Sequence, residues 1–192
     1  MGLVVLEMSM SLDGFVAGPN VDVQRPLGDG GERLHDWMFS GRTEQAAKAL
    51  EDAAFEATGS VVMGRRTFDV GEGSWGDDTF HVPCFVLTHE ARQALAKGPA
   101  TFTFVNDGID SALEQARAAA GDKNVMVMGG ADAARQFMKG GLLDELVIHL
   151  VPVLLGDGTR LFEHHGRARV ELERSELIEA PGVTYLRFRV AR

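Results

Sequence analysis

The chain has 192 residues, a length that suits a single domain of roughly 150 residues with little left over. Hydrophobic residues make up 45% of it and charged residues 24%, and this composition excludes a disordered chain. The net charge of −9 argues against nucleic acid as a partner and against an anionic membrane surface, because both carry negative charge themselves.

The N-terminus and the cysteine content predict a cytoplasmic protein. Residues 1–7 lack the cationic segment of a secretory signal, and no apolar run reaches the ~18 residues that a membrane span needs. Cys84 is the only cysteine, so neither a disulfide framework nor a thiolate metal cage can form, which fits a reducing compartment. The histidines show no metal-ligand spacing, and we expect no bound metal.

The first third of the chain predicts a strand, a long loop and a helix. Residues 3–8 form a short apolar run rich in strand formers. Glycines and prolines recur over residues 18–42, which predicts an irregular loop, and loops of this length are usually functional. Small apolar residues then recur at helical spacing from Thr43 until Gly59 ends the pattern.

The middle of the chain predicts strands that alternate with helices. Four short apolar runs are expected to form strands, over residues 60–63, 82–88, 101–105 and 124–128. Between the last two, Ser111 and Glu114 form a capping box that opens an amphipathic helix ending at Gly121. A short helix over residues 131–139 leads to a long strand over residues 144–155. This alternation predicts a largely parallel sheet.

The end of the chain has the pattern of strands with one solvent-exposed face. Val170 and Leu172 alternate with charged neighbours, and apolar and polar residues also alternate over residues 185–190. Such strands predict an antiparallel hairpin on the edge of the sheet. The hairpin strands could also pair between subunits and form a homodimer. Since no repeat or linker interrupts the sequence, we expect one domain over residues 1–192.

Residues 71–76 match the dinucleotide-binding pattern Gly-x-Gly-x-x-Gly. That pattern holds a pyrophosphate only where a strand precedes it and a helix follows it. Neither is predicted at this place, and the adjacent Asp77 and Asp78 would repel phosphate. We therefore interpret residues 71–76 as a surface loop.

Two other glycine turns do stand between a predicted strand and a predicted helix. Residues 64–67 combine a glycine, two arginines and a threonine at a helix start, a combination that can bind an anion. Residues 129–132 begin with a glycine pair, which lets a ligand approach the backbone closely. Each turn alone is explained equally well as a structural feature. Both together, at the C-terminal ends of strands in one sheet, favour a ligand site.

Other enzyme classes find no support in the sequence. No serine lies in a Gly-x-Ser-x-Gly elbow, and Cys84 is not followed by the second cysteine that a zinc deaminase requires. His149 lies within a predicted strand, and we interpret it as a packed or surface histidine and not as a catalytic base.

Several motifs resemble the dihydrofolate-reductase-like superfamily in order and spacing. They are residues 11–17 after the first strand, residues 62–68 and residues 127–130. Residues 142–146 and 152–162 are similar to the C-terminal reductase domain of the bacterial riboflavin-biosynthesis protein RibD. The resemblance covers nearly the whole chain. It implies an α/β fold with a twisted, mainly parallel sheet, helices on both faces, and NADPH lying across the C-terminal ends of the strands.

The resemblance also implies a set of cofactor-binding residues. The arginine turn would hold the phosphates on the adenosine side, and the end of the next strand would flank the adenine and the 2′-phosphate. The glycine pair would meet the pyrophosphate, and residues of the first strand and the turn after it would line the nicotinamide pocket. In chain order these residues are Ser9, Val16, Ala17, Gly64, Arg65, Arg66, Thr67, Leu87, Thr88, His89, Met128, Gly129, Gly130, Ala131 and Asp132.

Charge near this set bears on cofactor choice. Arg65, Arg66 and His89 gather positive charge where the 2′-phosphate is expected, and we expect no acidic residue there. Asp132 brings a negative charge near the pyrophosphate. Either its side chain caps the helix and points away, or the pyrophosphate contact is weaker.

The activity that the resemblance implies is an NADPH-dependent reductase of a small molecule. Hydride would pass to an imine, carbonyl or ring C=N group of a small heterocyclic or ribosylaminopyrimidine-type substrate, as in the reductase step of riboflavin biosynthesis. The deaminase half of RibD is missing from this chain. Two alternatives stay open: a dihydrofolate or pteridine reductase, and an NADPH-binding module without turnover.

Four residues near the presumed nicotinamide pocket are candidates for catalysis and substrate binding. Asp13, Asp36 and Glu44 could each supply the proton that follows the hydride, and the ring of Trp37 could cover a flat heterocycle. Ordinary structural roles compete with these assignments. Asp13 belongs to a turn, Glu44 can complement a helix dipole, and Trp37 can belong to the core.

Overall fold

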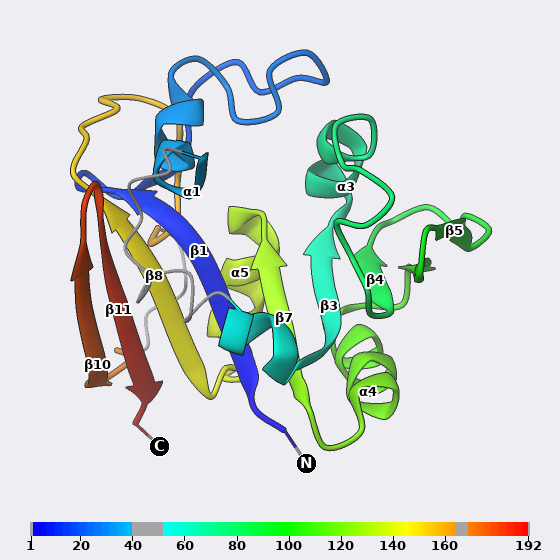
Figure 1. Cartoon of the computed structure of the whole chain (residues 1–192). Coiled ribbons are helices and arrows are strands. Elements are labelled where there is room, and N and C mark those ends of the chain that lie inside the picture. Colours follow the sequence, from blue (N-terminus) through cyan, green and yellow to red (C-terminus); the bar gives the residue numbers. More distant parts are fainter. Residues whose placement is uncertain (1, 40–51, 164–168, 192) are drawn as a thin grey trace.

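A computed structural model describes residues 2–39, 52–163 and 169–191 (Figure 1). The described strands form one large sheet and one small one. The large sheet contains β1 (Val4–Ser11), β3 (Thr58–Gly64), β4 (Cys84–Leu87), β5 (Leu95–Lys97), β6 (Ala100–Val105), β7 (Asn124–Gly129), β8 (Glu145–Val151), β10 (Leu172–Ala180) and β11 (Val183–Val190). The small sheet pairs β2 (Phe15–Ala17) with β9 (Thr159–Arg160).

The order of strands in the large sheet is β10-β11-β8-β1-β7-β3-β4-β6-β5. Each neighbouring pair from β8 to β6 is parallel. The pairs β10–β11 and β11–β8 at one end and β5–β6 at the other are antiparallel. The predicted parallel sheet with an antiparallel C-terminal hairpin on its edge is therefore confirmed.

Helices lie on both faces of this sheet, as expected. The helices with full bounds are the short 3₁₀ helix η1 (Gly31–Leu34), α1 (Asp36–Phe39), α3 (Arg65–Gly71), α4 (Ile109–Ala120) and α5 (Ala131–Lys139), and residues 52–57 are helical as well. Successive residues of a strand point to opposite faces. Val62 packs in the core with α4 and α5, whereas its neighbours Val61 and Met63 pack with Phe68 of α3.

Gly59 does not end a helix, contrary to the prediction. The predicted helix over residues 43–59 lies partly outside the described residues, and its described part, residues 52–57, leads directly into β3. A Cβ at Gly59 would lie 2.7 Å from the carbonyl oxygen of Ala120. Glycine is therefore needed here so that β3 can pack closely against the end of α4.

The predicted capping box of α4 is also wrong. The helix begins at Ile109 with Gly108 as its N-cap, and no side chain caps it. Oγ of Ser111 lies in the first turn and accepts a hydrogen bond of 3.1 Å from Nε2 of Gln115. The Ser-x-x-Glu pattern was therefore placed one turn too late to act as a cap.

Three other predicted segments have different bounds. β8 ends at Val151, not at residue 155, because Pro152 has no N–H to continue the ladder. The predicted loop over residues 18–42 becomes helical from residue 31 to residue 39. In the hairpin, β10 begins only at Leu172, so Val170 precedes the strand.

Of the predicted surface loop over residues 71–76, residues 72–76 form a loop, and three of them are exposed, whereas Gly71 is buried and helical. Gly71 is the last residue of α3, no strand precedes the segment, and turns follow it. A Cβ at Gly73 would meet no atom within 4 Å. The segment therefore lacks the strand and helix that a pyrophosphate-binding loop needs.

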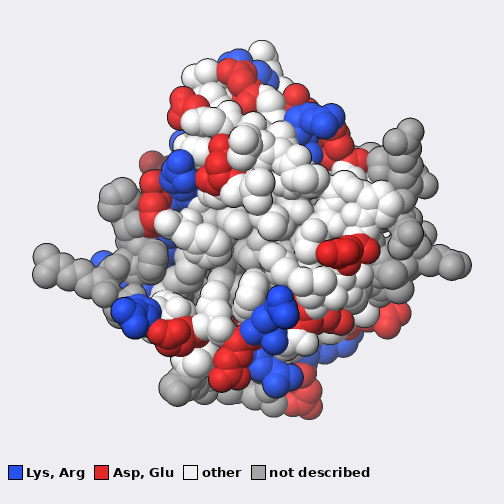
Figure 2. Space-filling view, turned by 90° about the vertical axis from the view of Figure 1, so that its left-hand side faces the viewer, with Lys and Arg blue, Asp and Glu red and all other residues white. Residues whose placement is uncertain are grey.

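Ion pairs tie the C-terminal hairpin to the sheet. Arg187 of β11 pairs with Glu145 of β8 at 3.0 Å and with Glu176 of β10 at 3.4 Å. Figure 2 shows the side of the molecule that lies on the left in Figure 1, where Lys and Arg residues stand beside Asp and Glu residues. None of the helices described in the structure is long and apolar enough to cross a membrane.

The topology brings the two glycine turns together. β3 runs into α3 and β7 runs into α5, and β3 and β7 are adjacent parallel strands in the register that pairs Met63 with Gly129. Both turns therefore leave the sheet at the same edge, the upper one in Figure 1. This is the edge at which open α/β sheets bind ligands.

Candidate functional site

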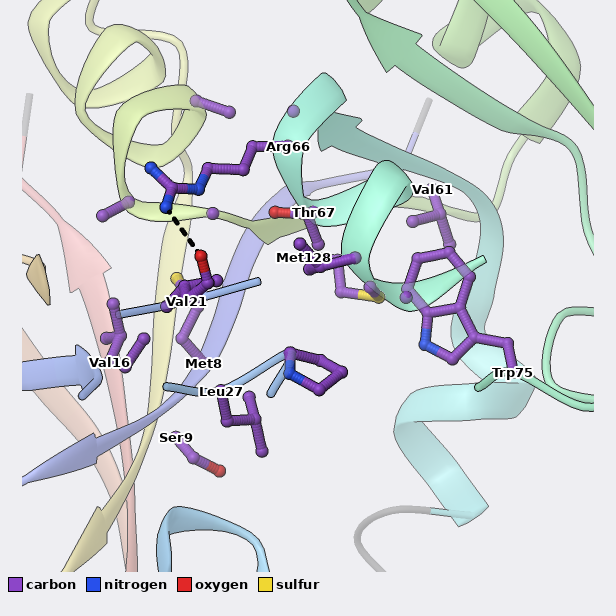
Figure 3. A pocket seen from close by; sticks show the side chains of 18 of the residues that line it. Met8, Ser9, Val16, Val21, Leu27, Val61, Arg66, Thr67, Trp75 and Met128 are labelled. Carbon is purple, nitrogen blue, oxygen red and sulfur yellow. Dashed lines mark hydrogen bonds between the residues drawn. The ribbon is translucent and has the colours of Figure 1, made fainter. Parts of the chain in front are cut away.

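A cleft of about 2060 Å³ opens along this edge of the sheet. Figure 3 looks into it: Met8 and Ser9 come from β1, and Arg66 and Thr67 come from α3. Leu27 belongs to the segment between β2 and η1 and also lines it. Strand ends, helix starts and a long connection thus surround one space.

Nearly all the residues expected to bind the cofactor line this cleft. They are Ser9, Val16, Ala17, Gly64, Arg65, Arg66, Thr67, Leu87, Thr88, His89, Met128, Gly130, Ala131 and Asp132. Gly129 does not line it. A Cβ at Gly129 would lie 2.7 Å from Cε of Met8, and its φ of 103° is one that few other residues adopt. Glycine is therefore needed at residue 129 for the backbone conformation of the turn after β7.

The start of α5 offers unpaired backbone N–H groups to the cleft. Within this nine-residue helix the first hydrogen bond is donated by the N–H of Ala134 to the carbonyl oxygen of Gly130, at 3.0 Å. The N–H groups of the three residues before Ala134 have no partner within the helix. Gly130 faces Thr67, because a Cβ at Gly130 would lie 3.0 Å from Oγ1 of Thr67. An anion at this place would meet backbone donors from α5 and a hydroxyl from α3.

Two outcomes were expected for Asp132: its side chain caps α5 and points away from the cleft, or the contact with a pyrophosphate is weaker. No side chain caps α5, and Oδ2 of Asp132 accepts a hydrogen bond of 2.9 Å from Nε2 of Gln136, one turn further along. The carboxylate is thus held along the helix, which favours the expectation that it points away from a pyrophosphate.

The two arginines at the start of α3 are held by different contacts. Nε of Arg65 donates to Oδ1 of Asp69 at 2.7 Å, and this hydrogen bond raises the pKa of Arg65. Nη2 of Arg66 donates to the carbonyl oxygen of Val21 at 3.2 Å, the dashed line in Figure 3. Both guanidinium groups keep further N–H donors for a ligand.

The expectation that no acidic residue lies beside these arginines is wrong. Asp69 and Glu90 line the same cleft, and both raise the pKa of Arg65 electrostatically. Asp69 escaped the sequence interpretation because it lies one helical turn after Arg65, on the same side of α3. Part of the positive charge at this end of the cleft is therefore compensated.

Asp13 has a structural role that the sequence did not reveal. Its carboxylate accepts hydrogen bonds from Oγ of Ser11 at 2.6 Å and from the backbone N–H groups of Leu155 and Gly156 at 3.1 and 2.8 Å. These bonds, that of Ser11 first, lower the pKa of Asp13 from 3.8 to about 2. Asp13 does not line the cleft. A carboxylate of this kind is a poor proton donor, so these contacts argue against the catalytic role expected for it.

We expect Asp13→Asn to lower stability at neutral pH and to flatten its pH dependence in acid. The native carboxylate has the lower pKa, so it stabilises the fold above pH ~4, and this contribution is lost as the pH falls toward ~2. The side-chain amide of the variant would set an N–H donor against a backbone N–H. Thermal melts between pH 2 and pH 7 measure this, with the exposed Asp78→Asn as control. Parallel curves for wild type and Asp13→Asn would contradict the assignment.

The other expected catalytic residues are not brought together. Asp36 is exposed, accepts a 2.8 Å hydrogen bond from Nη1 of Arg33, and does not line the cleft, so a catalytic role for it lacks support. Glu44 lies outside the described residues. Trp37 does line the cleft, but it is buried, and its Nε1 donates to the carbonyl oxygen of Leu34 at 2.9 Å. Trp37 is therefore part of the core and of the cleft wall at once.

Two residues that the sequence interpretation did not assign to the site line the cleft as a pair. Oε1 of Glu7 lies 3.0 Å from Nε2 of His149, and the side chains are 15% and 8% exposed. The available signal was Glu7 itself, because a carboxylate inside an otherwise apolar strand needs a partner. His149 was interpreted only as a packed or surface histidine, and it is packed, yet it also faces the cleft.

Within the described part of the chain, no group of three or more His, Cys, Asp or Glu side chains could hold a metal ion.

Comparisons with known proteins bear on this geometry. The uncharacterized protein YwjB of Bacillus subtilis (strain 168) is 25% identical over 169 residues, which cover 82% of this chain and 81% of YwjB. A putative riboflavin biosynthesis protein from Shewanella sp. PV-4 has a similar structure, with a TM-score of 0.77, 22% identity and 99% of each chain covered. Dihydrofolate reductase from Enterococcus faecalis, solved in complex with NADP(H) and RAB-propyl, gives a TM-score of 0.64 at 14% identity, covering 100% of this chain and 98% of that one.

The two solved structures share the fold of this chain, including its mainly parallel sheet with helices on both faces. The model of the RibD C-terminal domain family matches residues 3–183. Since that match extends over nearly the whole sequence, the protein belongs to the RibD C-terminal domain family.

Proposed function

We propose that this protein is an NADPH-dependent reductase that transfers a hydride to a small heterocyclic substrate of the ribosylaminopyrimidine type. One observation carries the proposal. The arginine turn at residues 64–67 and the glycine turn at residues 129–132 face one cleft at the C-terminal ends of adjacent parallel strands. A dinucleotide needs such a place, where two phosphate-binding turns lie on either side of one groove.

The residues of the cleft fit this cofactor. The open start of α5 and Oγ1 of Thr67 suit the pyrophosphate, and Arg65 with Arg66 suits a phosphate on the adenosine side. Val16 and Leu87 offer apolar surface to the nicotinamide ring and the adenine ring, respectively, at the two ends of the cofactor. When bound, the cofactor supplies the hydride. The protein's part is to align donor and acceptor and to exclude water.

The substrate end of the cleft would lie beyond Ser9, next to Trp37. Figure 3 places Ser9 at the end of the cleft away from Trp75. Trp37, Met38 and Glu7 also line the cleft and combine apolar surface with one carboxylate. Such a lining suits a flat heterocycle with hydrogen-bonding edges. A dihydrofolate or pteridine reductase, and a binding module without turnover, remain the alternatives.

Consumption of NADPH in the presence of a panel of substrates tests the proposal. Reduction of a ribosylaminopyrimidine phosphate alone would support it, and reduction of pteridines alone would favour the first alternative. Binding of NADPH without turnover of any pyrimidine or pteridine would favour the second. Failure of NADPH to bind would contradict the cofactor assignment itself.

We expect NADPH to bind more tightly than NADH. In Arg65→Ala, the ratio of the NADPH affinity to the NADH affinity should fall by about 10- to 100-fold. A charge-assisted hydrogen bond to the 2′-phosphate contributes about 1.5–3 kcal/mol, whereas a ribose hydroxyl offers no such charge. Asp69 reduces the effect, because it already binds Nε of Arg65. Calorimetry with both cofactors measures it, and the exposed Arg33→Ala, outside the cleft, is the control. Equal affinities in the wild type would contradict the assignment.

A cytoplasmic location and a homodimer remain predictions of this proposal. Cys84 is buried and the pKa of its thiol is raised to about 12 by burial, so it behaves as a core residue. β10 is the edge strand of the sheet and carries the exposed Leu172 and Leu177. An edge of this kind is where the predicted pairing between subunits would occur.

A further inference from the structure

The end of the cleft that is floored by β1 and β8 contains an acid–base pair. The parallel register of these strands sets Ser9 opposite His149, and Glu7 lies two residues earlier on the same face. Oε1 of Glu7 lies 3.0 Å from Nε2 of His149, and both side chains line the cleft. We call these two residues the Glu7–His149 pair.

The ring of His149 is fixed by its neighbours. It stacks on Trp37 with ring centroids 4.9 Å apart, and it meets Tyr185 edge-on at 5.4 Å. Tyr185 lies opposite His149 in the register of β11 and β8. The packing leaves the imidazole little freedom to turn, so Nε2 stays directed at Glu7.

Only one of the two carboxylate oxygens of Glu7 forms a hydrogen bond with a described residue. Oε1 has Nε2 of His149 as its partner, whereas Oε2 has no hydrogen-bond partner among the residues that the structure describes. Because Glu7 lines the cleft, a ligand there can approach Oε2.

Three further titratable groups of the described residues lie near the pair. Tyr185 and Arg187 have hydrogen-bond or ion-pair partners of their own, whereas Nδ1 of His35 is buried without one. The hydroxyl of Tyr185 accepts hydrogen bonds from Nη2 and Nε of Arg187 at 2.7 and 3.2 Å. His35, which precedes α1, also lines the cleft, and burial first and the nearby His149 second lower its pKa. Arg187 in turn forms ion pairs with two acidic residues of the neighbouring strands, Glu145 and Glu176.

We propose that Glu7 is the catalytic acid of this reductase, that His149 is the residue that positions it, and that the acceptor in the substrate is a C=N group. The proposal rests on the proposed function, since it deepens the reaction of the same cleft. Asp13 and Asp36 do not line the cleft, whereas Glu7 does, and its Oε2 has no hydrogen-bond partner among the described residues.

Atoms and electrons balance in this step. The C=N carbon accepts the hydride from the reduced nicotinamide and forms a C–H bond, while the electron pair of the C=N bond moves onto nitrogen. That nitrogen takes the proton from Oε2 of Glu7, so an N–H bond forms as the O–H bond breaks. The carboxylate left behind is stabilised by the N–H of Nε2 of His149, and solvent returns a proton to Glu7 before the next turnover.

The first test is Glu7→Gln, assayed with NADPH and two C=N acceptors. The acceptors are 7,8-dihydropterin and a ribosylaminopyrimidine phosphate, whose open-chain form is an imine. We expect kcat to fall by roughly 100-fold or more, the contribution typical of a positioned acid, with the NADPH affinity and the melting temperature nearly unchanged. Glu114→Gln is the matched control, because Glu114 is exposed on α4, lies outside the cleft and forms no ion pair in the described part of the chain.

The pH profile gives a second readout of the same variant. Wild-type kcat should fall as the pH rises and the acid loses its proton, whereas the kcat of Glu7→Gln should not show this decrease. Glu114→Gln should keep the wild-type profile. An unchanged profile in Glu7→Gln would overturn the assignment.

Two variants of His149 separate positioning from mere structure. His149→Gln keeps an N–H donor for Oε1 of Glu7, so its kcat should stay within about 10-fold of the wild-type value. The kcat of His149→Leu should fall as far as that of Glu7→Gln. In both, KM and the NADPH affinity should change little. If instead kcat, NADPH affinity and melting temperature decline together in all variants, the pair is structural and the proposal is overturned.

The failures of the two proposals can be told apart. If the wild type binds NADPH but reduces neither acceptor, the acid assignment is overturned and the cofactor site stands. If NADPH does not bind at all, the proposed function is overturned as well.

Discussion

Replacing Gly130 by valine should abolish NADPH binding and leave the fold in place. A Cβ at Gly130 would lie 3.0 Å from Oγ1 of Thr67, and the two methyl groups of valine would fill the space before the start of α5. That space is where we place the pyrophosphate. The φ of Gly130 is −66°, which valine adopts readily, so the substitution blocks the ligand with little strain on the backbone.

Calorimetry with NADPH, together with thermal melts, tests this prediction. Gly73→Val is the matched control, because Gly73 lies in the surface loop at residues 72–76 and a Cβ there would meet no atom within 4 Å. Gly130→Ala should give an intermediate loss, since its single methyl group faces only the hydroxyl of Thr67. A folded Gly130→Val that binds NADPH as the wild type does would mean that the turn is purely structural.

The two glycine turns could be predicted from sequence because their signals are local. A short apolar run, a glycine and the start of a helical pattern lie within a dozen residues at each turn. The alternation of strands and helices then predicted parallel strands, whose C-terminal ends share one edge. Nothing in the sequence showed that β3 and β7 are neighbours, because that follows from the order of strands in the sheet.

The candidate acids were harder to predict because their partners are remote in sequence. Asp13 was chosen for its place after the first strand, but the backbone groups that occupy its carboxylate are 142 and 143 residues away. Glu7 and His149 are also separated by 142 residues and meet only through the pairing of β1 with β8. Contacts of this kind depend on register, which one sequence does not specify.

Short elements were missed for a related reason. β5 has three residues and β9 has two, and each is held by pairing with another strand and not by a pattern of its own. The helical turns η1 and α1 follow Gly30 in a segment whose glycines and prolines predicted only a loop. α1 carries Trp37 to the stack on His149, so a missed element forms one wall of the substrate end.

The two ends of the cleft are built in different ways. At the end where we propose the cofactor, the start of α5 and side chains of the helix α3 line the cleft. At the end where we propose the substrate, side chains from β1 and β8 form the Glu7–His149 pair on the sheet itself. The orientation of Arg65 and Thr67 therefore depends on how firmly α3, only seven residues long, is anchored to the sheet.

That anchor is Phe68, and Phe68→Ala should cost about 3–5 kcal/mol of stability. Phe68 is fully buried, and its ring lies 5.2 Å from that of Phe102 and 5.1 Å from that of Phe104. For a chain of this size, each kcal/mol lowers the melting temperature by roughly 2–4 °C, which gives a decrease of roughly 6–20 °C. NADPH affinity should fall too, because the neighbouring Thr67 and Arg65 lose the packing that orients them.

Denaturant unfolding measures the change in stability, and calorimetry measures the change in NADPH affinity. Phe162→Ala is the control for removing a phenylalanine ring elsewhere in the chain. Phe162 is 42% exposed, so its removal should change stability by no more than about 0.5 kcal/mol. If Phe68→Ala melts within ~2 °C of the wild type, the cluster around α3 repacks and does not depend on this ring. If it melts early yet binds NADPH normally once folded, α3 is positioned by its connection to β3 alone, and the aromatic cluster serves stability without serving the site.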